Sequence, residues 1–66
     1  MLAPATRMAM VRSYQEQHGI KFHDALRIYN QLDREMPDVY GEDGQKDFDR
    51  RYAEAVQAMQ RTTPTP

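Results

Sequence analysis

The stretch that decides the fold is "YQEQHGIKFHDALRIYN", residues 14–30, where a glycine separates two segments with helical periodicity. Gly19 suits the position just after a helix C-terminus, which takes the left-handed conformation, and Ile20 can then fold back on Tyr14 as in a Schellman cap. The sequence therefore predicts a helix that ends just before Gly19, a sharp corner, and a second helix that begins at Phe22.

The predicted second helix, about residues 22–36, has the clearest amphipathic pattern in the chain. At about 100° per residue its apolar side chains share one arc, which Asp33 interrupts. Pro37 ends the helix, because the residue before a proline is pushed out of the helical region. The arc predicts a helix packed on a core through Phe22, Ala25, Leu26, Ile28, Tyr29, Leu32 and Met36.

A first helix is predicted over about residues 4–18, with Pro4 in its first turn, where a missing N–H costs nothing. Arg7 interrupts its apolar face, which consists of Met8, Met10, Val11, Tyr14 and His18.

A third helix is predicted over about residues 45–60, with Asp43 or Gly44 as its N-cap. The preceding "PDVYGEDGQ" is predicted to be a loop from its proline and glycines. The end, "RTTPTP", is predicted to be a disordered tail over residues 61–66, because its prolines stop a helix. The stripe of the third helix consists of Phe48, Tyr52, Ala55, Val56 and Met59.

The length of 66 residues and the absence of cysteine predict one small all-α domain, a three-helix bundle over residues 1–60 without disulfides. A chain this short buries only about 60% of the surface of its unfolded form. Arginines interrupt the apolar runs of the N-terminus, so we expect no signal peptide and no membrane span, and a cytoplasmic protein.

Charge is unevenly distributed along a chain whose net charge is −1. Residues 1–31 and 50–66 each carry a small basic excess, whereas residues 32–49 form an acidic segment. The loop in that segment contains a tyrosine surrounded by acids, a composition that protein interfaces favour. The predicted protein-binding site is therefore Asp38, Val39, Tyr40, Glu42 and Asp43; the alternative for Tyr40 is that it covers the core.

Enzymatic and metal-binding functions find little support in the sequence. No nucleophile is paired with a base, and no glycine-rich phosphate loop is present. His18 and His23 with Asp24 are badly spaced for a metal site, and the acidic loop does not match the calcium-loop register. We expect a non-enzymatic protein with no metal and no cofactor, in which His18 is partly buried and His23 exposed.

The glycine corner also suggests DNA binding as an alternative function. In a helix-turn-helix, a glycine and a branched apolar residue precede a helix whose outer face enters the major groove. Gln15, four residues before Gly19, is larger than that motif usually has, and the acidic segment would repel phosphate. The nucleic-acid-binding residues of this alternative are Lys21, His23, Arg27 and Arg34.

Residues 11–30 resemble a short helix-turn-helix segment of phage-encoded proteins, including head-assembly and protease-scaffold proteins. The resemblance covers about a third of the chain and implies an origin in a phage or other mobile element, and so the host cytoplasm as location. It rests on Tyr14, His18, Gly19, Ile20, Phe22, Asp24, Ala25 and Leu26.

Together these observations predict a non-catalytic protein-interaction module that regulates, inhibits or helps assemble a larger protein partner. Opposite charges on separate faces would also allow homo-oligomers. The alternative is a small helix-turn-helix DNA-binding regulator.

Overall fold

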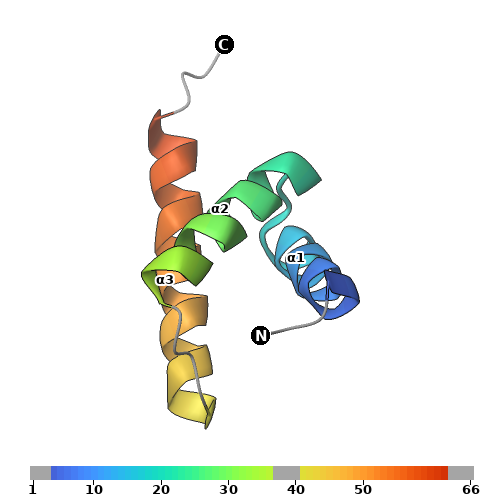
Figure 1. Ribbon diagram of the computed structural model, residues 1–66. Coiled ribbons are helices and arrows are strands. Elements are labelled where there is room, and N and C mark those ends of the chain that lie inside the picture. Colours follow the sequence, from blue (N-terminus) through green and yellow to red (C-terminus); the bar gives the residue numbers. More distant parts are fainter. Residues whose placement is uncertain (1–3, 37–40, 63–66) are drawn as a thin grey trace.

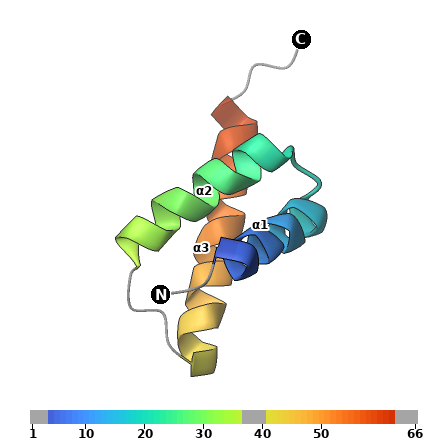
Figure 2. The same cartoon turned by 45° about the vertical axis from the view of Figure 1, so that its right-hand side comes forward.

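A computed structural model describes residues 4–36 and 41–62, and within them the chain forms α-helices and no strand (Figure 1). The helices are α1 (Pro4–His18), α2 (Phe22–Glu35) and α3 (Gly41–Thr62). Helix α2 crosses α3 diagonally, and α1 packs beside α2 (Figures 1 and 2). The predicted all-α three-helix fold is confirmed.

The corner between α1 and α2 has the predicted glycine cap. Gly19 has a φ of 61°, and the Ile20 N–H donates to the Gln15 carbonyl at 3.3 Å, which is the long hydrogen bond of a Schellman motif. Lys21 is extended and caps α2, and its carbonyl accepts from the Ala25 N–H at 2.9 Å. Because no heavy atom lies within 4 Å of an added Cβ, the conformation of Gly19, and not the space around it, favours glycine.

The core lies where the three helices meet, and its centre is aromatic. The rings of Tyr14 and Tyr52 stack with centroids 4.1 Å apart, and Phe48 lies 5.8 Å from Tyr14 and 5.5 Å from Tyr29. Aromatic pairs at such separations contribute about 0.5–1.5 kcal/mol beyond their buried area. The buried residues are Val11, Tyr14, Ala25, Ile28, Tyr29, Leu32, Phe48, Tyr52 and Val56.

The two charges that interrupt the predicted apolar faces form an ion pair with each other. Arg7 of α1 lies 3.6 Å from Asp33 of α2, and both side chains are close to half exposed. Each charge therefore reaches the edge of the α1–α2 contact, where water and the opposite charge solvate it. His18 is half-buried and stacks on Tyr52 with centroids 5.4 Å apart, whereas His23 is exposed; both positions are as predicted.

The boundaries of α3 differ from the prediction. The helix begins at Gly41 instead of Gln45, so the expected cap at Asp43 or Gly44 is wrong. Gly41 has a φ of 71° and makes the turn itself, and the acids that follow it in the first turn favour the positive end of the helix dipole.

At its other end α3 continues through Thr62, so the predicted tail begins too early. The first proline after Gln60 is Pro64, so nothing in the sequence stops the helix at Arg61; residues 63–66 lie outside the described residues. Two smaller differences concern methionines: α2 ends at Glu35, one residue before Met36, and Met8 is 37% exposed and not part of the core.

Candidate functional site

A polar cluster joins α1 to the first half of α3. The Tyr14 hydroxyl donates to Asp49 Oδ1 at 2.6 Å, and the Gln45 amide donates to the Tyr14 oxygen at 2.9 Å and to Asp49 Oδ1 at 3.0 Å. Burial, and then the Asp49 carboxylate, raise the pKa of Tyr14 above its usual value. The phenol therefore remains a hydrogen-bond donor at neutral pH, and the cluster holds the two helices together.

The apolar periodicity of the sequence does not predict this cluster. Gln45 and Asp49 are four residues apart on α3 and border the apolar stripe that contains Phe48 and Tyr52. Such i, i+4 polar pairs at the edge of a stripe are the available signal. The cluster contributes to an open hollow of about 170 Å³, whose lining also includes Met10, Ser13 and Gln17.

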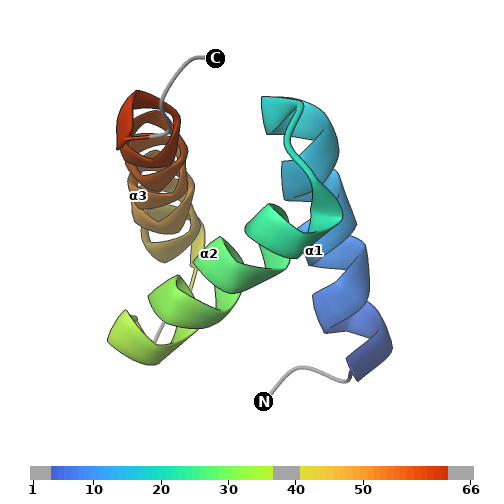
Figure 3. The ribbon, with the colours of Figure 1, turned by 90° about the horizontal axis from the view of Figure 1, so that it is seen from above.

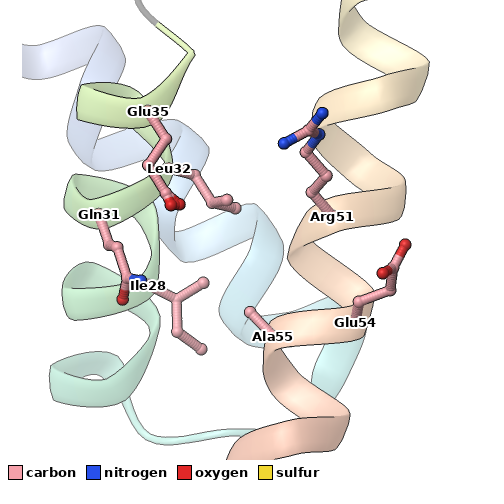
Figure 4. A pocket seen from close by; sticks show the side chains of 7 residues that line it. All are labelled: Ile28, Gln31, Leu32, Glu35, Arg51, Glu54 and Ala55. Atoms are coloured by element: carbon pink, nitrogen blue, oxygen red, sulfur yellow. The ribbon is translucent and has the colours of Figure 1, made fainter.

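A groove of about 210 Å³ lies between α2 and α3. Its floor is apolar, formed by Ile28 and Leu32 of α2 and Ala55 of α3 (Figure 4). Polar and charged side chains from both helices form its rim, which gives it the apolar centre and polar border found in protein interfaces. The rim residues are Gln31, Glu35, Arg51 and Glu54.

The charges on the rim are not equivalent. Arg51 points toward α2 in Figure 4 and its Nε lies 3.2 Å from Asp47 Oδ2, whereas Glu35 and Glu54 form no ion pair within residues 4–36 and 41–62. Asp47 also binds Arg50, and this hydrogen bond is the main cause that lowers the pKa of the Asp47 carboxyl. The groove thus has two carboxylates at its border, Glu35 and Glu54, and Glu54 also attracts Arg50. The charge of Arg51 is only partly balanced, because Asp47 is shared between Arg51 and Arg50.

The residues predicted for DNA binding lie together on the outer side of α2. His23, Arg27 and Arg34 are exposed on that helix, and Lys21 is exposed at its cap. Arg27 lies 3.4 Å from Asp24, so part of its charge is balanced. Two residues that the prediction omitted, Asn30 and Leu26, complete a hollow with His23, Arg27 and Arg34.

The predicted acidic protein-binding site is only partly described. Asp38, Val39 and Tyr40 lie outside the described residues. Glu42 and Asp43 are exposed in the first turn of α3, not in a loop. Whether this site binds a protein stays a prediction.

No three histidine or acidic side chains in the described part of the chain are grouped so that they could hold a metal ion. None of the described helices has the length and apolar character needed to cross a bilayer.

Comparisons of the chain with protein families, with curated proteins and with solved structures found no match.

Proposed function

We propose that this protein is a non-catalytic interaction module, encoded by a phage or other mobile element, that regulates, inhibits or helps assemble a larger protein partner. The groove between α2 and α3 carries this proposal, because it combines an apolar floor with a charged rim at the surface (Figure 4). An apolar side chain of a partner can fill such a groove while the rim excludes water around it.

The charge of the rim specifies the chemistry of the partner. Glu35 and Glu54 border the groove, and Asp47 already binds Arg51. The matching partner segment presents an apolar side chain flanked by lysine or arginine. Glu42 and Asp43, from the acidic site predicted by the sequence, add negative charge at the start of the same helix α3.

Site-specific photo-crosslinking in extracts of the source cells tests the proposal. A benzoylphenylalanine at Gln31, on the groove rim, is expected to form adducts with one or a few defined proteins. The matched control is Gln57, an exposed glutamine of α3 that does not line the groove. Identical adducts from both positions, or none from Gln31, would contradict a docking role for the groove.

A charge reversal then tests the chemistry of the partner. Glu54→Lys is expected to weaken capture of the crosslinked protein at least several-fold, because it puts a like charge opposite the basic flank. Glu16→Lys, at an exposed position on α1, is the control and should leave capture unchanged. A crosslinker at Glu42 reports separately on the first turn of α3.

A further inference from the structure

The outer side of α2 carries a straight stripe of four polar side chains. His23, Arg27, Asn30 and Arg34 are spaced by four, three and four residues, so they lie on one face of the helix, and all four are exposed. Figure 3 shows α3 on one side of α2 and α1 on the other. By helical spacing the stripe lies opposite the buried residues of α2, and Arg27 at its edge also reaches the Met59 sulfur of α3 at 3.8 Å. We propose that the stripe binds double-stranded DNA by entering its major groove.

The side-chain chemistry of the stripe suits base edges. Arginine can bind guanine with two hydrogen bonds, and asparagine can do the same with adenine. Leu26 is half-buried and lines the same hollow as the stripe, where it offers an apolar contact for a thymine methyl group. The stripe therefore combines donors, an acceptor and an apolar surface, which are the groups that read base edges in the major groove.

The shape of α2 also fits a DNA groove. At 1.5 Å per residue, the eleven steps from His23 to Arg34 span roughly 16 Å along the helix axis. A helix with its side chains is about 10–12 Å wide, close to the roughly 12 Å width of the major groove. The stripe is thus a convex ridge that a concave groove can receive.

Cations at both ends of the stripe are placed for phosphate contacts. Lys21 is exposed at the cap of α2, beside the N–H groups of its first turn, which also attract anions. Arg7 of α1 lines a second hollow with Asn30, Asp33 and Arg34 at the other end. Because both side chains in the 3.6 Å contact between Arg7 and Asp33 are close to half exposed, it is a weak ion pair that a phosphate can replace.

Most of the acidic segment lies away from this surface. Of its described acids, Glu35 lines the groove toward α3, and four others belong to α3 itself. Only Asp33 of that segment borders the stripe, with Asp24 of α2 beside Arg27. The repulsion of phosphate expected from the sequence is therefore smaller on the outer side of α2 than the chain order suggests.

Fluorescence anisotropy with a labelled mixed-sequence duplex of about 20 base pairs tests the inference on the full chain. If binding neutralises about three phosphates, the slope of the logarithm of the affinity against the logarithm of the salt concentration is near −3. This slope corresponds to a loss of affinity of roughly 40-fold between 50 and 200 mM salt. Binding at 50 mM salt with such a slope is the expected result. No binding of the native protein at 50 mM salt would overturn the proposal.

Two matched double variants distinguish DNA binding through the stripe from a general effect of positive charge on the protein. Arg27→Ala with Arg34→Ala should lower affinity at least about tenfold and flatten the salt slope. Arg50→Ala with Arg61→Ala removes the same charge from exposed positions on α3 and should change affinity less than twofold. Equal losses in both pairs would show non-specific attraction and overturn the proposal.

A single variant tests base contacts, and circular dichroism confirms that each variant is folded. Asn30→Ala should reduce discrimination among duplexes of different sequence without changing the salt slope. If the Arg27 and Arg34 variant keeps the duplex affinity and the salt slope of the native protein, DNA does not bind through the stripe and the inference is wrong. None of these substitutions touches the α2–α3 groove floor or the Glu54 and Gln31 positions, so the result is independent of the proposed function.

Discussion

Replacing Tyr52 with phenylalanine isolates one buried hydrogen bond in this small core. The Tyr52 side chain is fully buried, and its hydroxyl donates to the Ala25 carbonyl at 2.7 Å. Phenylalanine keeps the ring that stacks on Tyr14 and removes only the donor. The carbonyl belongs to the interior of α2, where the helical ladder supplies another donor, so the expected loss is that of one neutral hydrogen bond, about 0.5–1.5 kcal/mol of unfolding free energy.

Tyr29→Phe is the matched control. Tyr29 is 3% exposed, so its ring is buried nearly as completely, but the acceptor of its hydroxyl within residues 4–36 and 41–62 is the Met10 sulfur, at 3.6 Å. Thioether sulfur is a weak acceptor, so this substitution should lower the unfolding free energy by under about 0.5 kcal/mol. The two variants make the same chemical change and differ in the partner of the lost hydroxyl.

Urea and thermal unfolding followed by circular dichroism measure the difference. For a domain of this size 1 kcal/mol corresponds to about 4–8 °C in Tm, so Tyr52→Phe should lower the Tm clearly more than Tyr29→Phe does. The slope of the unfolding free energy against urea concentration should be the same in both variants, because the surface exposed on unfolding is unchanged. Equal losses, or a larger loss in Tyr29→Phe, would refute the assignment of the effect to the bond with Ala25.

Three further predictions concern pH, the glycine corner and the ion pair between α1 and α2. Burial raises the pKa of Tyr52 to about 12 and also raises that of Tyr14, so the folded state keeps protons that the unfolded state loses near pH 10. The unfolding free energy from urea titrations should therefore be steady from neutral pH to about pH 10 and fall above it, by up to about 1.4 kcal/mol per pH unit for each such tyrosine. A flat profile above pH 10 would contradict this. Gly19→Ala should lower the unfolding free energy by about 1–2 kcal/mol in thermal unfolding through its positive φ alone, and an unchanged Tm would show that the corner adapts. A double-mutant cycle of Arg7→Ala and Asp33→Ala should give a coupling below about 1 kcal/mol that shrinks in high salt, whereas a larger, salt-independent value would indicate a buried pair.

The existence and order of the helices could be predicted from the sequence because local signals determine them. Gly19 and Ile20 specify the corner, and the apolar arc of α2 specifies its buried side. The start of α3 was less predictable, since Gly41 and Gly44 both suit a turn and the acids between them suit either a loop or a first helical turn. Local patterns rank such alternatives poorly when two glycines lie three residues apart.

The contacts between helices were less accessible, because periodicity gives the buried side of a helix but not the neighbour it meets. The bonds among Tyr14, Gln45 and Asp49 depend on how α3 is rotated and shifted against α1. The groove floor depends in the same way on where Ala55 lies beside Ile28. Neither arrangement follows from the spacing of apolar residues within a single helix.

The irregularities in the apolar faces nevertheless contained information about these contacts. Arg7 and Asp33 each interrupt an otherwise apolar arc, and they have opposite charges. An interruption of this kind is costly unless the charge reaches water or a partner, so two such residues on helices joined by a short corner are candidates for pairing. Their observed contact lies where the N-terminal half of α1 packs beside the C-terminal half of α2, and this packing places Arg7 in the same hollow as Arg34, as the DNA inference requires.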